Sequence, residues 1–213
     1  MKRILITAGA TRTYLDDIRF ISNNATGTLA SYIALQAINK KMHVTFIHGK
    51  ESIVPYTNSK LLKLIEIETV EDLVKVINKE LKNKKYDAFV HTIGVTDYIP
   101  IKKIKGKISS NSKFLTIKLK KCPKIINIIK KISLFTYTIG CKLESNVTNE
   151  TLIKRAKELM KKSKANLVIA NDYKSVKKGT HAAFIISKDK IEFTTGKLNI
   201  AKSIIDKIQE LWE

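Results

Sequence analysis

Cysteine and long apolar runs are both scarce in this chain, and each shortage excludes a class of protein. The only two cysteines, Cys122 and Cys141, are too few for a disulfide framework, and neither belongs to a Cys-x-x-Cys pair. Reduced thiols in a reducing compartment are therefore expected. No apolar run approaches the ~20 residues that span a bilayer, and the stretch after Met1 is too short for a signal peptide. We expect a cytoplasmic protein without a membrane partner.

Arginine is rare although the chain is strongly basic. The formal net charge is +21, but only four of the 40 basic residues are arginine. Surfaces that bind nucleic acid usually rely on arginine, often with aromatic side chains in between for base stacking. Here the lysines are scattered, and many fall on the outward faces of expected helices, such as Lys154, Lys157 and Lys161. The charge therefore indicates solvated surface and steering of anionic substrates, and we expect no nucleic-acid partner.

The loop after the first apolar stretch lacks a dinucleotide fingerprint. That motif places three glycines within six residues, whereas this loop has Gly9 and then only Gly27. The residues from Asn23 to Gly27 nevertheless open directly into a helical pattern. Backbone N–H groups and small hydroxyls then meet at a positive helix end, which suits a phosphate. The alternative is an ordinary N-cap in which Thr26 satisfies the first turn, and the spacing alone leaves both interpretations open.

Strand-like and helix-like patterns alternate along the whole chain, and no linker interrupts them, so residues 1–213 are expected to form a single domain. Short apolar runs predict strands over residues 4–6, 42–47, 61–67, 88–90, 114–119, 135–139 and 167–170. Helical spacing predicts helices over residues 28–39, 70–81, 123–131, 149–162 and 198–211, and a hairpin is expected over 182–187 and 191–195. Pro123 suits a first helical turn. This order is typical of a Rossmann-like, doubly wound α/β fold, with a mostly parallel sheet, helices on both faces and a C-terminal hairpin.

Polar residues follow the expected strands at the edge where ligands of such sheets bind. Asp97 lies just beyond the fourth strand of the series, where a carboxylate suits a ribose, a base or a magnesium ion; a turn-forming aspartate is the alternative. The lysine-rich stretch 102–107 suits a phosphate clamp on a mobile loop, because ammonium groups neutralise the charge that develops in phosphoryl transfer. Solvated surface lysines are the alternative for that stretch.

Several of these segments, taken in order, resemble one family. The stretch 16–27 is similar to the Asp-x-Val-Arg-x-Ile-x-Asn-x-Ser-x-Gly motif of phosphopantothenate–cysteine ligases. The later matches read Val95-Thr96-Asp97-Tyr98, Lys107-Ile108-Ser109-Ser110, Lys121-Cys122-Pro123-Lys124-Ile125-Ile126, Gly140-Cys141-Lys142-Leu143-Glu144 and Ala170-Asn171-Asp172. Each motif is weak alone, but their order is specific, and they cover nearly the whole chain. The chain looks like the stand-alone bacterial form of the family, without a fused flavin-dependent decarboxylase.

This resemblance implies a ligase of coenzyme A synthesis that uses CTP with Mg²⁺ and works as a homodimer. It would join 4′-phosphopantothenate to cysteine through an acyl-nucleotide, releasing pyrophosphate and then CMP. Family roles carried to matching positions make Asn23 and Lys107 catalytic, Asn23 at the acyl-nucleotide and Lys107 at the nucleotide phosphates. The implied nucleotide-binding residues are His91, Thr92, Ile93, Asp97, Lys107, Pro123, Lys124, Ile125, Ile126, Cys141 and Lys162, with Lys164 as an alternative to Lys162. The implied phosphate and substrate contacts are Gly9, Arg19, Asn24, Thr26 and Gly27, and no residue is assigned to a metal site.

The chain departs from the family pattern at several positions, and two other classes of protein compete. Ala10 replaces a usual glycine, Thr28-Leu29-Ala30 follows Gly27 in place of Lys-x-Gly, and Cys141 replaces a usual phenylalanine. The segment between Asp97 and Lys107 is also short for the stand-alone form. An NAD(P)-dependent short-chain reductase would fit the α/β start, but its Tyr-x-x-x-Lys pair occurs three times and discriminates nothing. A basic RNA-binding module is the other alternative, and it would require a recognition signature that is not visible.

Overall fold

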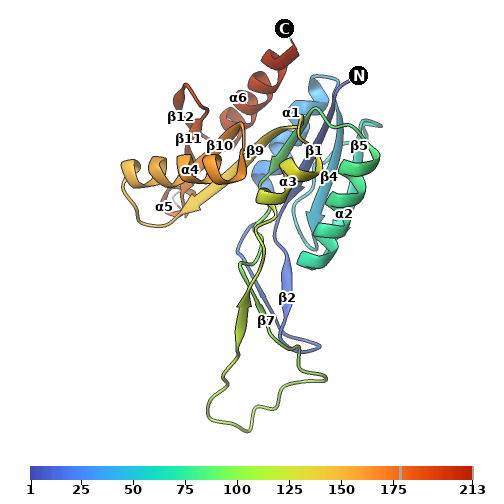
Figure 1. Cartoon of the computed structure of the whole chain (residues 1–213), viewed down its shortest axis with the longest axis vertical. Helices are drawn as coiled ribbons and strands as arrows, with labels where there is room; N and C mark the ends of the chain where they lie inside the picture. The colour runs from blue at the N-terminus through green and yellow to red at the C-terminus, as the bar shows by residue number, and fades with distance from the viewer. Residues whose placement is uncertain (178, 213) are drawn as a thin grey trace.

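The computed structural model describes residues 1–177 and 179–212 and consists of a layered body with a projecting arm. The body is a twisted sheet with helices on both sides (Figure 1). The arm leaves the sheet at the edge where its parallel strands end. Among the described residues, no helix is long and apolar enough to cross a membrane.

The main sheet follows the strand order of a doubly wound fold. Its strands are β1 (Arg3–Ala8), β4 (His43–Gly49), β5 (Leu62–Ile67), β6 (Ala88–His91), β9 (Tyr137–Glu144), β10 (Leu167–Asp172), β11 (Ala182–Ile186) and β12 (Ile191–Thr195). They lie in the order β12-β11-β10-β9-β6-β1-β4-β5, and every neighbouring pair from β10 to β5 is parallel. β11 is antiparallel to both β10 and β12. The predicted Rossmann-like, mostly parallel sheet with a C-terminal hairpin is confirmed.

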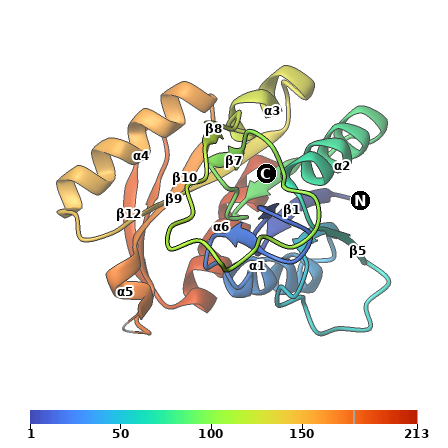
Figure 2. The same cartoon turned by 90° about the horizontal axis from the view of Figure 1, so that it is seen from below.

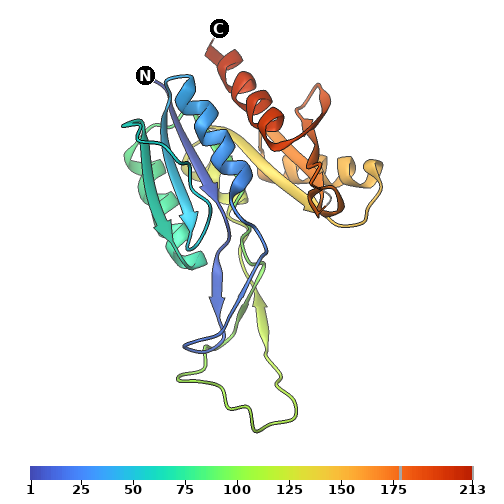
Figure 3. The ribbon, with the colours of Figure 1, turned by 180° about the vertical axis from the view of Figure 1, so that it is seen from behind.

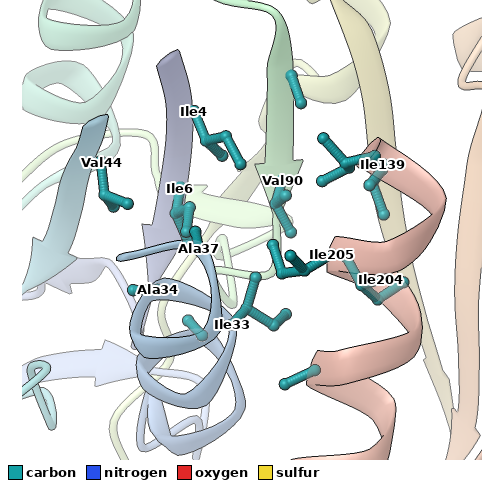
Figure 4. Packing of buried hydrophobic residues seen from close by; sticks show 14 of the residues in the cluster. Ile4, Ile6, Ile33, Ala34, Ala37, Val44, Val90, Ile139, Ile204 and Ile205 are labelled. Carbon is teal, nitrogen blue, oxygen red and sulfur yellow. The ribbon is translucent and has the colours of Figure 1, made fainter. Parts of the chain in front are cut away.

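Helices cover both faces of this sheet, as predicted. β1 shows why, because Ile4 and Ile6 face one cluster of buried side chains while Leu5 between them faces the other. Figure 4 shows the first cluster, in which Ile33 and Ile204 from two helices meet the sheet. Those helices are α1 (Thr28–Asn39) and α6 (Lys197–Gln209), and Figure 3 shows them on the same face. The opposite face carries α2 (Val70–Asn83), α3 (Ile126–Ile132) and α4 (Asn149–Ser163).

The starts of the helices differ in how they are capped. Thr69 and Asp72 form a reciprocal capping box at the start of α2, in which each side chain accepts the backbone N–H of the other residue. Thr148 caps α4 by accepting from the Thr151 amide at 3.3 Å. The N-cap of α1 is Gly27, with a left-handed φ of 83°, and it has no side chain to cap the helix; among the described residues, only the Thr28 amide has a side-chain acceptor, the Thr26 hydroxyl at 3.4 Å. The positive end of α1 is therefore open to a ligand.

The arm consists of two small hairpins that lie side by side. β2 (Arg12–Tyr14) pairs with β3 (Phe20–Ser22), and β7 (Tyr98–Pro100) pairs with β8 (Leu119–Lys121), both antiparallel. The hairpins join where the Thr96 hydroxyl lies 3.4 Å from that of Thr11 and 2.8 Å from that of Thr13. Residues 101–118 form the loop at the far tip of the arm, which projects well beyond the sheet (Figure 1) and lies in front of the body when the molecule is seen from below (Figure 2).

The structure corrects several of the predicted elements. Residues 114–119 do not form a strand of the main sheet but lie in the arm, where Phe114 is 80% exposed. α3 begins at Ile126, so Pro123 precedes the helix and is not in its first turn. An earlier start was predicted because proline suits a first helical turn. No sequence pattern predicted β2, β3, β7 or the short helix α5 (Tyr173–Lys177), because each is too brief to show a period.

Candidate active site at the carboxyl edge of the sheet

The candidate site lies where the strand order reverses, at the carboxyl ends of β1 and β6. Successive connections leave these adjacent strands in opposite directions, so the chain divides there and exposes backbone groups to a ligand. The loops after the two strands are joined by main-chain hydrogen bonds. The Gly94 amide donates to the Gly9 carbonyl at 2.8 Å, and the Thr11 amide donates to the Gly94 carbonyl at 3.2 Å. The two loops therefore form one continuous backbone surface.

Glycines allow three loops to approach closely at this point. A Cβ atom on Gly9, whose φ is 73°, would lie 1.6 Å from the Ser52 Oγ atom in the loop after β4. A Cβ atom on Gly94 would lie 3.0 Å from the Cβ atom of Asn23. Gly27 also has a positive φ, and it is the N-cap residue of α1. The predicted contacts Gly9, Asn23 and Gly27 are thus brought together at the open N-terminus of α1.

Asn23 is held against the loop after β6 and does not cap α1. Its Nδ2 group donates to the Val95 carbonyl at 3.0 Å. Thr26 makes a local turn, in which its Oγ1 atom accepts from the Thr28 amide at 3.4 Å, but the N-cap position belongs to Gly27. Asn23 is therefore not the cap of α1, whereas Thr26 still satisfies one amide of the first turn, as the capping interpretation expects. Asn24 extends the site toward β10, because its Nδ2 group donates to the Tyr173 hydroxyl at 3.2 Å.

The side chains at the end of β6 turn into the protein. His91 is buried, stacks on Phe89 with ring centroids 5.5 Å apart, and its Nδ1 atom lies 2.9 Å from the Thr7 hydroxyl. Burial lowers the pKa of His91 to about 4, so the ring is neutral near pH 7. Thr92 donates its hydroxyl to the Thr7 carbonyl at 2.7 Å, and Ile93 is buried in the core. A nucleotide contact at these three predicted positions would use the backbone of residues 91–93.

A second group of predicted residues gathers at the root of the arm, before α3. The Cys122 amide donates to the Asp97 carbonyl at 2.8 Å, and the Lys124 Nζ atom lies 3.5 Å from an Asp97 carboxylate oxygen. Pro123 is exposed, whereas Ile125 and Ile126 are buried and anchor the segment. The structure therefore brings together Asp97 and the predicted stretch 123–126.

Cys141 lies on β9 beside β10. Its Sγ atom is 3.8 Å from the Asn171 Oδ1 atom, and burial raises the pKa of the thiol to about 11. The side chain is therefore a neutral thiol near pH 7 and not a nucleophilic thiolate. The neighbouring Gly140 allows α3 to approach β9, because a Cβ atom there would lie 2.6 Å from Ile126 Cδ1. Cys141 itself points to the opposite face and packs against the cluster of α1 and α6, so the structure does not bring its side chain to the predicted stretch 123–126.

Arg19 and Lys107 lie together on the arm, away from Asn23. Lys107 is exposed in the tip loop, and the guanidinium of Arg19 donates to the carbonyl of the next residue, Ile108, at 3.1 Å. Figure 1 shows this part of the arm projecting from the sheet edge. The sequence suggested a mobile lysine loop, but hydrogen bonds fix residues 104–108 to the hairpin of β2 and β3. Positive charge is therefore presented by a braced segment.

Lys162 and Lys164 are not brought to this edge. Lys162 lies in the last turn of α4, and Lys164 is its C-cap with a left-handed φ of 56°. The chain continues directly into the amino end of β10 at Leu167, which is the opposite edge of the sheet from Gly9. The nucleotide role of either lysine stays a prediction that the structure does not support by proximity to the glycine loop.

Some residues near the site were not predicted from the sequence. Tyr173 could have been found, because it directly follows Asn171-Asp172 at the carboxyl end of a predicted strand. Ser52 gave no signal, since its contact with Gly9 depends on the path of a loop. The pairing of Asp16 with the tip loop joins residues 92 positions apart and also gave none.

The fold and this edge define a Rossmann-like α/β protein with its candidate site at the reversal of strand order. A family model described as "DNA/pantothenate metabolism flavoprotein C-terminal domain" matches residues 1–211. The chain therefore belongs to this family, which confirms the resemblance seen in the sequence.

Individual proteins agree with that assignment. The chain is 33% identical over 213 residues to the coenzyme A biosynthesis bifunctional protein CoaBC of Thermococcus kodakarensis, covering 99% of this chain and 51% of that protein. It is 30% identical over 215 residues to the CoaBC protein of Methanocaldococcus jannaschii, covering 98% of this chain and 51% of that protein. The crystal structure of the DNA/pantothenate metabolism flavoprotein from Streptococcus pneumoniae superposes with a TM-score of 0.92 at 28% identity, covering 99% and 100% of the two chains. The chain thus spans about half the length of the curated relatives it matches.

Proposed function

We propose that this chain joins 4′-phosphopantothenate to cysteine, with CTP as the activating nucleotide. The observation that carries the proposal is the placement of Asn23, whose amide is fixed against the Val95 carbonyl beside the uncapped N-terminus of α1. A neutral amide next to a positive helix end suits an acyl-nucleotide, which presents a phosphate and a carbonyl side by side. Membership in the family and the coenzyme A biosynthesis proteins among its relatives support the same assignment.

In the first proposed step, the substrate carboxylate attacks the α-phosphorus of CTP, and the bond to pyrophosphate breaks. An acyl-cytidylate remains, and the departing pyrophosphate carries the developing negative charge. Catalysis then consists mainly of holding the reactants in line and neutralising charge. The N-terminus of α1 serves one phosphate group, while Lys107 and Arg19 supply cations from the arm.

In the second proposed step, the neutral amine of cysteine attacks the acyl carbonyl and forms the amide bond. The amine loses a proton and CMP departs with the electron pair of the broken acyl–phosphate bond. Asn23 can orient the acyl-nucleotide during this attack without adding negative charge. His91 does not serve as the base, because its ring is buried and contacts Thr7.

Mg²⁺ is proposed to bind together with the nucleotide. Among the described residues, no group of three or more His, Cys, Asp or Glu side chains could hold a metal ion. Mg²⁺ is commonly held by one or two carboxylates and the substrate phosphates, with several waters. Asp97 is one carboxylate at this edge, and it already faces Lys124. We therefore treat MgCTP as the co-substrate and assign no protein-built metal cage.

The proposal includes a homodimer in the cytoplasm. Large apolar side chains are exposed on the arm, among them Phe114 at 80% and Leu115 at 55%, and such surface favours association. Light scattering on the purified chain should give twice the mass of one chain. A monomer at micromolar concentration would contradict this part.

The proposed activity is tested by pyrophosphate release. Purified protein is supplied with phosphopantothenate, cysteine and Mg²⁺, and CTP, ATP, GTP and UTP are added in turn. We expect release that requires phosphopantothenate and is fastest with CTP. Release that is equally fast with ATP would overturn the choice of nucleotide, and no release with any nucleotide would overturn the activity.

A further inference from the structure

Two consecutive aspartates hold the segment that carries Lys107. Asp16 and Asp17 lie in the turn between β2 and β3, about ninety positions before the tip loop. The Ile108 amide donates to Asp16 Oδ2 at 2.9 Å, and the Gly106 amide donates to Asp17 Oδ2 at 2.8 Å. The peptide N–H groups of both neighbours of Lys107 are therefore each held by a carboxylate.

The two oxygens of Asp16 have different partners. Oδ1 accepts the amides of Ile18 at 2.8 Å and Arg19 at 2.6 Å, as expected of an aspartate that forms a turn. Oδ2 accepts from Ile108 and from the Arg19 guanidinium at 3.2 Å. Turn formation explains the first oxygen only. Since Asp16 is 0% exposed, a donor that loses this carboxylate is not readily compensated by water.

Main-chain bonds extend the attachment on both sides of Lys107. The Asp17 amide donates to the Gly106 carbonyl at 3.1 Å, and the Ile104 amide donates to the Leu15 carbonyl at 2.9 Å. Asp17 also pairs with Lys103 at 2.8 Å. The Lys107 backbone is thus fixed on the hairpin of β2 and β3, although its side chain is exposed.

We propose that Asp16 and Asp17 are positioning residues for Lys107, which they hold in the orientation that meets the triphosphate of the nucleotide. The inference rests on the proposed function, because it takes Lys107 to be the phosphate-binding lysine. Fixing the backbone beforehand reduces the conformational entropy that is lost when the ammonium group meets its ligand. The carboxylates act through Lys107 and do not touch the nucleotide, whose charge would repel them.

The substitution Asp16→Asn separates the two tasks of this residue. The amide side chain keeps one acceptor oxygen for the Ile18 and Arg19 amides, but its NH₂ group then faces the Ile108 amide. Hydrogen exchange of the Ile108 amide should become about 10-fold faster, the effect of one lost hydrogen bond. The dissociation constant of MgCTP, measured by calorimetry, should rise about 10-fold as well. Exchange in β1 and β6 should stay unchanged.

Two matched variants show whether the effect acts through Lys107. Lys103→Gln removes the half-exposed ion pair with Asp17 but leaves both carboxylates in place to hold the Gly106 and Ile108 amides, so its effects should be less than about 3-fold. In a Lys107→Ala background, Asp16→Asn should still make hydrogen exchange of the Ile108 amide faster but should leave the affinity for MgCTP unchanged. A merely structural role would lower affinity equally in both backgrounds.

The outcomes separate this inference from the proposed function. Unchanged Ile108 exchange in Asp16→Asn, or an equal loss of MgCTP affinity with and without Lys107, would overturn the positioning role. Wild-type protein that binds MgCTP but makes no product would instead overturn the ligase assignment. The MgCTP affinities of Asp16→Asn with and without Lys107→Ala would still test the role of the aspartates. Faster Ile108 exchange together with a Lys107-dependent loss of affinity would support the inference.

Discussion

The body and the arm of this protein are stabilised in different ways. In the body, side chains such as Ile33 and Ile204 are fully buried between helices and the sheet. In the arm, Phe114 and several other large apolar side chains face outward. Hydrogen bonds to Asp16 and the Thr96 hydroxyl pairs hold its two hairpins together instead. Burial of apolar area therefore determines the body, whereas directional polar contacts determine the arm.

This difference assigns different parts of the proposed chemistry to the two regions. The body supplies a rigid edge with Asn23 and the N-terminus of α1, while the arm supplies Arg19 and Lys107. Neutralising a triphosphate requires the cations, and orienting the acyl group requires the edge. A change in the arm should thus impair activity without unfolding the body, whereas a change in the core should lower the free energy of unfolding.

The largest expected effect comes from Lys107→Ala. Loss of this ammonium group should abolish pyrophosphate release, because the charge on the leaving group is no longer neutralised. Since the side chain is exposed, stability should fall by less than ~0.5 kcal/mol. Lys105→Ala, at an exposed position in the same loop, is the matched control and should keep near wild-type activity. A folded Lys107→Ala variant with normal pyrophosphate release would show that the arm does not take part in activation.

Asn23→Asp should separate the two half-reactions. The variant should still release pyrophosphate at first but accumulate acyl-nucleotide, since a carboxylate beside the phosphate repels it and removes an amide donor. Product should form ~10²–10³-fold more slowly. Quenched samples analysed by mass spectrometry would follow the intermediate. Full product at the wild-type rate would mean that Asn23 only braces the Val95 carbonyl.

A pair of alanine substitutions compares the two regions by stability. Ile33→Ala removes a fully buried side chain of α1 and should lower the free energy of unfolding by about 2–5 kcal/mol. Phe114→Ala removes a larger side chain that is 80% exposed and should cost less than ~0.5 kcal/mol. Urea unfolding of both variants checks this. Equal losses would contradict the division between a core-stabilised body and a polar arm.

Stability should depend on pH through His91. Its pKa is about 4 in the folded protein and near 6.5 when unfolded, so the unfolded state binds the proton more readily. The contribution of His91 to the free energy of unfolding is fully present above pH 6.5 and decreases as the pH falls toward 4. From pH 8 to pH 5 the free energy of unfolding should fall by roughly 2 kcal/mol on this account.

His91→Asn should remove this part of the pH dependence. The remaining slope would include His181, another buried histidine whose pKa burial lowers. Denaturant unfolding at pH 5, 6.5 and 8 measures the difference. The same slope in the variant and the wild type would show that His91 is already protonated or solvated.

The smallest effect is expected on the outward face of α4. Replacing Lys154, Lys157 and Lys161 with glutamine should leave turnover nearly unchanged at physiological salt, because exposed charges are screened over ~8 Å. The same variant should show no altered retention on RNA. A large loss of turnover, or loss of a salt-sensitive RNA complex, would favour the binding-module interpretation.

The body could be predicted from the sequence because its elements are long and periodic. Residues 28–39 form α1 as predicted, and the apolar runs at residues 4–6 and 88–90 fall within β1 and β6. The arm could not be predicted, because its three-residue strands show no period and its contacts join distant residues. The apolar run at 114–119 was misleading, since alternation predicts a strand but not where its side chains face.

The candidate site likewise contains residues that the sequence could place and residues that it could not. Motif order placed Asn23, Gly27 and Asp97 at the carboxyl edge of the sheet, where the structure has them, because all three follow predicted strands or start a predicted helix. The bracing of Lys107 by Asp16 depends on tertiary folding of the arm and carried no local signal. The position of Lys162 at the opposite edge likewise follows from the direction of α4 and not from its residue type.

Formation of the acyl-nucleotide without cysteine tests the central claim most directly. Wild-type protein, phosphopantothenate and MgCTP labelled at the α-phosphorus would be mixed, quenched and analysed for products. We predict about one equivalent of acyl-cytidylate and of pyrophosphate per active site, followed by conversion to the cysteine amide and labelled CMP when cysteine is added. Release of orthophosphate and labelled CDP, or no product that depends on phosphopantothenate, would contradict the proposed ligase.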